Sequence, residues 1–327
     1  MIVLSLFDGI SCGQIAFERL GITFDGVKNK YISSEIKKIA IETTQLHYPN
    51  TIQVGDVTKL HWDEETHALY SDWDFHHNKC YGEEPTKILE EKPDIIIGGS
   101  PCQNFSTLRV TSGNGNTIDG LKGDKSVLFY EYIRLLKEIQ PKYFLLENVR
   151  MRKDSKEELD NYLDVNGIMI DSKLVSYQTR ARYYWTNIPN VTSPKDKHIS
   201  YQDYIDTDIN RCNEAIPNKT PSRIRMWSNG ESPINTMTKC ANLINADKVG
   251  CISRKQDRCP NSGMMPYKDW CRFLTRREME MAQTLPTGYC DNLSYGQACD
   301  VIGDGWTVDV IKHILSFIPE IQSERWR

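Results

Sequence analysis

The sequence predicts an α/β fold with a doubly wound, mostly parallel sheet of the Rossmann-like kind and a second, small, loop-rich domain. Two observations predict the sheet. Short apolar runs of strand length alternate with stretches of helical spacing over the first 150 residues, and polar or glycine residues directly follow the apolar runs. Strands that alternate with helices form parallel sheets that helices cover on both faces. A third observation, a basic stretch with little apolar periodicity between residues 211 and 258, predicts the loop-rich domain.

Each element is predicted by its residue pattern, in chain order. The run 2-IVLSLF-7 ends in Asp8-Gly9 and precedes the helical spacing of 13-GQIAFERLG-21, which indicates strand, glycine turn and helix. Residues 61–92 are acidic, aromatic and irregular, which favours an excursion from the sheet rather than a domain. Further strands are predicted at 31–35, 51–57, 94–99 and 143–149, and further helices at 36–49 and 126–140.

The composition is that of an ordinary globular protein, with 39% hydrophobic residues in 327. No run approaches 18 apolar residues, and the N-terminal apolar run lacks a basic flank and contains an acid, so neither a membrane span nor a signal peptide is expected. Ten cysteines without regular spacing indicate reduced thiols. Cys251, Cys259 and Cys271 lack the paired spacing of zinc sites, so no metal is expected. We therefore predict a cytoplasmic protein without a membrane partner.

Polar residues follow successive predicted strands. Ligands of open α/β sheets lie beyond the carboxyl ends of the strands, so these residues are expected to share one crevice. Glu35 stands where an acid can accept hydrogen bonds from ribose hydroxyls, and Asp56 could accept from an exocyclic amino group. Either acid could instead cap the helix that follows it. The strand-end residues are Asp8-Gly9, Glu35, Asp56, Pro101-Cys102 and Glu147-Asn148.

Cys102 and Glu147 form the chemically most suggestive pair in this crevice. Cys102 follows a proline that restricts the backbone, and a cysteine there can be a nucleophile or inert packing. Glu147 ends the apolar run 143-YFLLENV-149, so we expect a partly desolvated acid that can carry a proton near neutral pH. A thiol beside a protonated carboxyl group suits attack on an electron-poor aromatic ring.

The stretch 211–258 carries nine basic and four acidic residues, although the whole chain has a net charge of −4. A basic insert in an acidic chain favours a polyanionic partner. Ordinary charge variation on a solvated surface explains the count equally well.

These residues together resemble the cytosine-5 DNA methyltransferases, in order and spacing. The resemblance covers residues 1–198 and 268–327, and the motifs are similar to those of the catalytic domain of vertebrate de novo DNA methyltransferases. It divides the chain into a catalytic domain (1–198), a target recognition domain (199–267) and a C-terminal segment that returns to the catalytic domain (268–327). The matching motifs are FDGISCG from Phe7, Glu35, Gly55-Asp56-Val57, Gly99-Ser100-Pro101-Cys102, Glu147-Asn148-Val149, 178-QTRAR-182, 272-RFLTRRE-278 and 303-GDGWTVDVI-311.

The resemblance implies a reaction. Cys102 would add to carbon 6 of a cytosine flipped out of duplex DNA, Glu147 would act at ring nitrogen 3, and Arg180 and Arg182 would place positive charge near the thiolate or the base carbonyl. Carbon 5 would then take the methyl group of S-adenosylmethionine, leaving S-adenosylhomocysteine. The residues implied to hold the cofactor are Phe7, Asp8, Gly9, Ile10, Ser11, Glu35, Asp56, Val57, Ser100 and Trp306.

The basic insert occupies the place of the family's recognition domain, and double-stranded DNA is the expected partner. Residues 107–124 are rich in glycine and suit a lid over the flipped base. Asp304 departs from the pattern, because the nearest relatives carry a basic residue there. The candidates for base or backbone contacts are Arg223, Arg225, Asn242, Arg254, Lys255 and Gln256.

The absence of a regulatory module before Met1 leads us to expect a stand-alone prokaryotic or phage enzyme, acting in a bacterial or phage-infected cell. A cognate restriction endonuclease is a further expected partner. Two alternatives stay open at this point. One is methylation of tRNA, and the other is a catalytically silent nucleic-acid-binding relative.

Overall fold

The computed structural model describes residues 1–74, 79–80, 85–100, 127–228 and 240–323. The chain forms two compact units. Unit 1 comprises Met1–Ile170, Ala181–Ser193 and Lys312–Arg327, and unit 2 comprises Asp171–Arg180 and Pro194–Ile311. Unit 2 contains the predicted recognition segment 199–267 as well as residues 268–311, which the sequence assigned to a separate C-terminal segment. The recognition role of this segment stays a prediction.

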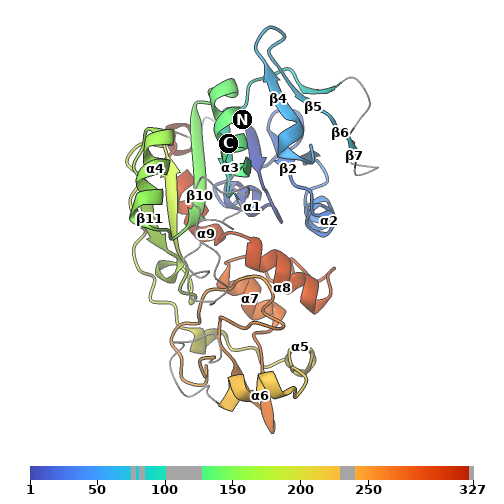
Figure 1. Ribbon diagram of the computed structural model, residues 1–327, viewed down its shortest axis with the longest axis vertical. Coiled ribbons are helices and arrows are strands. Elements are labelled where there is room, and N and C mark those ends of the chain that lie inside the picture. Colours follow the sequence, from blue (N-terminus) through green and yellow to red (C-terminus); the bar gives the residue numbers. More distant parts are fainter. Residues whose placement is uncertain (75–78, 81–84, 101–126, 229–239, 324–327) are drawn as a thin grey trace. The chain divides into compact units, whose positions relative to one another are not determined.

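Unit 1 is built on a mostly parallel sheet, which confirms the predicted fold class (Figure 1). Strand β1 runs parallel to β2 on one side and to β9 on the other, and β9 runs parallel to β10. The chain therefore winds outward in both directions from β1. Strand β12 is antiparallel to β10. Among the described residues the strands lie in the order β11 (Ile168–Asp171), β12 (Ala181–Thr186), β10 (Tyr143–Val149), β9 (Ile95–Gly98), β1 (Ile2–Leu6), β2 (Lys30–Ser34) and β3 (Ile52–Gln53).

The sheet is stable because its central strands are apolar on both faces. Every residue of β1 and β9 is buried, as expected of parallel strands that helices cover. Phe129, Tyr132 and Ile133 of α3 belong to the same buried cluster as the strand residues Leu4 and Ile96. Among the described residues, the α-helices of unit 1 are α1 (Cys12–Glu18), α2 (Lys38–His47), α3 (Val127–Ile139), α4 (Lys153–Leu163) and α10 (Pro319–Gln322), and α9 (Val308–Leu315) has residues in both units.

The sequence prediction for two segments of unit 1 needs correction. The third strand was expected over 51–57 but is only two residues long, because Gly55 has a φ of 68° and Asp56 begins the 3-10 helix Val57–Lys59. The excursion at 61–92 is more regular than its composition indicated. Its described strands form the small antiparallel sheet β4 (Leu60–Asp63), β5 (Ala68–Ser71) and β8 (Thr86–Leu89) and the pair β6 (Trp73–Asp74) and β7 (Lys79–Cys80).

Unit 2 has long loops around a buried ion pair. The Arg272 guanidinium donates to both carboxylate oxygens of Glu278, at 2.7 and 2.8 Å, and both side chains are buried. Glu278 also accepts from the backbone of Thr275, which caps α7. The 272–278 motif is therefore the anchor of this unit. Its elements are α5 (Ile209–Glu214), α6 (Pro221–Ser228), β13 (Met265–Tyr267), β14 (Trp270–Arg272), α7 (Arg276–Ala282) and α8 (Tyr295–Asp304).

Two searches of the described residues complete the description. They contain no helix long and apolar enough to cross a membrane. They also contain no group of three or more His, Cys, Asp or Glu side chains arranged to hold a metal ion.

Candidate active site at the carboxyl ends of the strands

The strand register brings the predicted site residues of unit 1 to one edge of the sheet. Leu6 pairs with Ser34 and with Gly98, and Gly98 pairs with Leu146, so these four residues form one row across the sheet. The residues that follow the row are Phe7, Glu35, Gly99 and Glu147. This edge lies where the strand order reverses, between β1 and β9, and ligands of open α/β sheets bind at such points.

The turn after β1 has an unusual backbone. Phe7, Gly9 and Ser11 have φ values of 58°, 61° and 54°, in the left-handed region. Non-glycine residues adopt this region only at a cost in free energy, so something must hold Phe7 and Ser11 there. Among the described neighbours, a Cβ on Gly9 would meet nothing within 4 Å. The turn therefore borders open space at Gly9, where a ligand can approach the backbone.

Asp8 holds this turn from inside. Its Oδ1 accepts hydrogen bonds from Ser5 Oγ at 2.5 Å and Tyr31 OH at 2.8 Å, and its Oδ2 accepts from Ser33 Oγ at 3.0 Å and from Ser11 Oγ. We call these four hydroxyl groups and the carboxylate the Asp8 cage. Burial raises the pKa of Asp8 above its usual value, whereas the hydroxyl hydrogen bonds oppose that rise. The Asp8 side chain therefore points into the protein core. The predicted cofactor contact at this position would be made by the backbone of the turn.

Glu35 ties the second strand to the same turn. Its Oε2 accepts from the Gly9 backbone N–H at 2.9 Å, and its Oε1 accepts from the N–H groups of Ile36 and Lys37, both at 2.9 Å. The carboxylate is nearly buried, yet Oε2 takes only this hydrogen bond from the described backbone. Glu35 is therefore fixed directly beside Gly9, and its Oε2 can accept a further hydrogen bond.

Asp56 has the capping role that the sequence left open as an alternative. Its Oδ1 accepts from Thr58 N and from Thr58 Oγ1, both at 2.9 Å, at the start of the 3-10 helix. Val57 is buried in the core of unit 1. Ile10 and Ser11 are likewise buried, at the start of α1. These residues shape the crevice, and their contact with a cofactor stays a prediction.

The loop that carries the predicted nucleophile starts from a fixed position. Ser100 is buried, and its Oγ accepts from Asn148 Nδ2 at 3.1 Å. This hydrogen bond joins the Gly-Ser-Pro-Cys motif to the Glu-Asn-Val motif of β10. Cys102 itself and the predicted lid at 107–124 lie outside the described residues.

Glu147 and Arg182 form a shielded ion pair at the carboxyl end of β10. Arg182 Nε lies 3.0 Å from Glu147 Oε1, and the two side chains are only 14% and 11% exposed. The antiparallel register explains the contact, because Arg182 is opposite Val149 and so lies diagonal to Glu147 on the same face. The pair orients the carboxyl group at the carboxyl end of β10.

Arg180 and Trp306 belong to unit 2. The buried Arg180 guanidinium donates to the carbonyl oxygens of Ile252 at 2.7 Å and Gly305 at 3.0 Å. It therefore joins the loop before α9 to the basic segment. Trp306 is buried next to this contact. The predicted roles of both residues toward thiolate and cofactor stay predictions.

The predicted DNA-contacting residues differ in their exposure. Arg225, Arg254 and Lys255 are exposed, whereas Arg223 is half-buried and donates to the Asp257 carbonyl oxygen at 2.9 Å. The Asn242 Oδ1 accepts from Ile244 N at 3.0 Å.

Gln256 is buried, and its side chain is bonded to Ser253 and Ser262. In this conformation Gln256 supports the fold of the segment and offers no group to a base.

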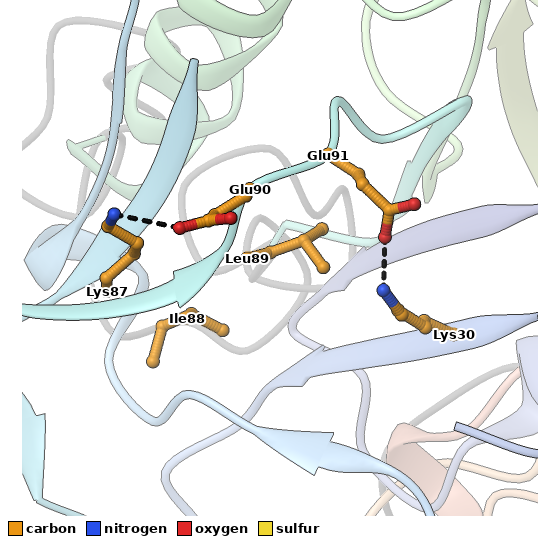
Figure 2. A pocket seen from close by; sticks show the side chains of 6 residues that line it. All are labelled: Lys30, Lys87, Ile88, Leu89, Glu90 and Glu91. Atoms are coloured by element: carbon orange, nitrogen blue, oxygen red, sulfur yellow. Dashed lines mark hydrogen bonds and ion pairs between the residues drawn. The ribbon is translucent and has the colours of Figure 1, made fainter. Parts of the chain in front are cut away.

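A separate surface hollow lies away from the candidate site (Figure 2). It has a volume of about 390 Å³ and is lined by charged side chains that pair with each other, Lys30 with Glu91 and Lys87 with Glu90. Lys30 begins β2, so the hollow lies at the amino end of that strand, opposite Glu35. We assign it no part in the chemistry.

The chain is similar in sequence to curated methyltransferases. The type II methyltransferase M.FnuDI of Fusobacterium nucleatum is 31% identical over 152 residues, which are 46% of this chain and 33% of the relative. The orphan methyltransferase M.Rho11sI of Bacillus phage rho11s is 32% identical over 150 residues, which are 45% of this chain and 23% of the relative. The matched part thus spans a third or less of the length of these curated relatives.

The fold is shared over the whole chain. The structure of the Entamoeba histolytica methyltransferase EhMeth superposes with a TM-score of 0.67 at 15% identity, covering 99% of this chain and 98% of that one. The model of the family described as C-5 cytosine-specific DNA methylase matches residues 1–177, more than half of the chain. The chain belongs to the C-5 cytosine-specific DNA methylases.

Proposed function

We propose that this protein transfers a methyl group to carbon 5 of a flipped cytosine in duplex DNA, through a covalent adduct with Cys102. One observation carries the proposal. The strand register places the Glu147–Arg182 pair, the Ser100 start of the Cys102 loop and the turn at Gly9 along one edge of one sheet. An acid, a nucleophile loop and an open glycine turn are the parts that this reaction requires.

The residues at this edge fit S-adenosylmethionine. The open space at Gly9 admits a ligand close to the backbone, and Glu35 Oε2 stands beside it as a hydrogen-bond acceptor for ribose hydroxyls. Phe7, Val57 and Ser100 would border the same ligand, and Trp306 would join them from unit 2. When bound, the cofactor supplies the methyl group that carbon 5 accepts.

The protein's own groups activate the base. The Cys102 thiolate adds to carbon 6, and the electron pair of the C5–C6 double bond shifts into the ring while Glu147 protonates nitrogen 3. Carbon 5 becomes nucleophilic enough to be methylated. Loss of the carbon-5 proton to water then restores the double bond, the thiolate leaves, and Glu147 takes back the proton from nitrogen 3.

Arg182 is a positioning residue in this scheme. Its guanidinium holds Oε1 of Glu147 at 3.0 Å and so fixes the direction of the carboxyl group toward the base. The role of Arg180 toward the base or the thiolate stays a prediction.

We propose duplex DNA as the substrate and residues 199–267 as the recognition segment. A cytosine cannot react inside the stack, so it must be flipped into the site. The exposed Arg225, Arg254 and Lys255 are the first candidates for phosphate or base contacts, with Arg223 and Asn242 beside them in the same unit. Gln256 would support these contacts from within the segment.

The experiment is transfer of labelled methyl from S-adenosylmethionine to duplex DNA, with bisulfite-type sequencing of the product. Wild-type protein should label cytosines in a fixed context, and Cys102→Ser should label none. Glu147→Gln should lower the rate by about 10²–10⁴-fold, since it removes a general acid. Labelling of tRNA but not of duplex DNA would show that the RNA alternative is right, and labelling of neither would favour a silent scaffold.

Three finer expectations are part of the proposal. The likeness to vertebrate de novo enzymes rests on the sequence motifs, and the bacterial or phage setting is supported by the two curated relatives. A restriction endonuclease partner also stays a prediction. The names of these two relatives do not decide between a chain with and a chain without such a partner, because one is called a type II methyltransferase and the other an orphan methyltransferase.

A further inference from the structure

Two acids of α8 face a basic turn of unit 2. The turn 252–259 carries Arg254, Lys255 and Arg258, and α8 carries Asp300 and Asp304. We call these five residues the α8 charge cluster. Arg254 Nε lies 3.5 Å from Asp304 Oδ2 and 3.9 Å from Asp300 Oδ1, and Arg258 Nη2 lies 3.7 Å from Asp300 Oδ2. Asp257, 3.5 Å from Arg258, is the third acid, so three positive and three negative charges cancel.

The turn is held against α8 by backbone contacts, one of which runs to the Asp300 side chain. The Lys255 N–H donates to Asp300 Oδ1 at 3.1 Å. A Cβ on Gly303 would lie only 2.4 Å from backbone atoms of Ser253 and Arg254, so the helix and the turn approach as closely as a glycine permits. The basic side chains therefore stay beside the acids without requiring strong ion pairs to bring them there.

The two acids lie at positions of α8 where negative charge destabilises the helix. Asp300 and Asp304 are one turn apart in the last two turns of α8, where the helix dipole disfavours negative charge and like charges at this spacing repel. The helix would be more stable with neutral residues there. Their charge is thus explained by the cations on the facing turn.

The ion pairs are loose enough for a stronger anion to displace them. Charge-assisted hydrogen bonds are typically about 2.7–2.9 Å long, and the pairs of Arg254 and Arg258 with the α8 acids are all longer. The side chains of Arg254 and Arg258 are 47% and 51% exposed. Exposed pairs of this kind contribute little to stability, so both guanidinium groups can turn to a phosphate.

We infer that Asp300 and Asp304 restrain binding of the Arg254–Arg258 turn to the phosphodiester backbone of nucleic acid, by occupying its cations until phosphates replace them. The inference rests on the proposed function, because it assumes that unit 2 contacts DNA. It also explains why Asp304 departs from the family pattern. In this chain Asp304 forms an ion pair with Arg254 of the turn 252–259.

The test compares Asp300→Asn/Asp304→Asn with wild type in binding to a random-sequence duplex, measured by fluorescence anisotropy across salt concentrations. Removing two charges a few ångströms from a bound phosphate should tighten binding about threefold at low salt, from screened Coulomb energies, and should steepen the salt dependence. Asp203→Asn/Asp247→Asn removes the same charge from exposed positions of unit 2 and is the matched control. It should change the affinity much less.

A second background isolates the proposed contact. In Arg254→Gln/Arg258→Gln protein, the two aspartate substitutions should have no further effect on affinity. An equal gain from the control pair, a gain that persists without the arginines, or a loss of affinity would each overturn the inference. Methyl transfer by wild-type protein is measured in parallel. If wild type methylates duplex DNA and the variants bind unchanged, only the inference fails, whereas no methylation or binding of any duplex by wild type contradicts both.

Discussion

Replacing Asp8 by alanine should destabilise unit 1 strongly, because its side chain is buried and holds the turn after β1. The substitution removes the acceptor of all four hydroxyl groups in the Asp8 cage. Hydrogen bonds to charged groups contribute about 1.5–3 kcal/mol each. The sum is not realised, because burial of the carboxylate costs free energy and hydroxyl groups rotate to new partners. We expect a net loss of about 3–4 kcal/mol, near the upper end for a single substitution.

The assay is urea unfolding, together with titration of S-adenosylmethionine against the folded protein. With an m value of about 3 kcal/mol/M, the midpoint should fall by about 1 M. Cofactor affinity should fall as well, since Phe7 and Ser11 lose the anchor of their left-handed conformation. Asp25→Ala is the control. Asp25 accepts three backbone N–H groups but is exposed, so its loss should matter less. A loss below about 1 kcal/mol for Asp8→Ala, or one equal to that of the control, would refute the reasoning.

Three further substitutions test other parts of the structure. Glu278→Gln leaves the buried Arg272 guanidinium without its counter-charge. In urea unfolding, this substitution should destabilise unit 2 by about 3–5 kcal/mol. A loss of unfolding free energy below about 1 kcal/mol would contradict a structural role for the pair. Burial acts to raise the pKa of Asp206, but hydrogen bonds from Arg211 and others hold that pKa well below its usual value. The ionised Asp206 therefore stabilises the fold at pH values above the unfolded-state pKa of about 3.9. This stabilisation is lost as the pH falls. Asp206→Asn should therefore be less stable than wild type at pH 7, with a gap that narrows below about pH 4, and a gap independent of pH would exclude the mechanism. Gly9→Val places a side chain in the open space of the crevice and should abolish cofactor binding measured by calorimetry while the protein stays folded, and full affinity would place the cofactor elsewhere.

The sequence alone predicted those strands of unit 1 whose residues form a clear local pattern. Strands at 2–7, 31–35, 94–99 and 143–149 were predicted within one residue at each end. Apolar runs of this length that are bounded by glycine, proline or acids are typical of strands. The antiparallel sheet at 60–89 was missed. In its strand Leu60–Asp63, residues alternate between buried and half-buried, but charged residues nearby obscured the alternation.

The Asp8 cage was also missed, and a signal for it exists. Ser5 interrupts the otherwise apolar strand β1, and Ser33 lies buried in the neighbouring strand β2. A buried hydroxyl needs a partner, and the parallel register sets these two residues side by side. The pairing of Asp304 with Arg254 had no such signal, because it depends on how α8 packs against a loop 50 residues earlier in the chain.

The most direct test of the central claim is to trap the Cys102 adduct. A duplex containing 5-fluorocytosine at the methylated position blocks the last step, because fluorine cannot leave carbon 5 as a proton does. Wild-type protein with S-adenosylmethionine should form a complex with this duplex that survives denaturing electrophoresis, and peptide mapping should locate the bond at Cys102. A wild-type protein that methylates ordinary duplex but forms no such complex, or a Cys102→Ser variant that still forms it, would contradict the account.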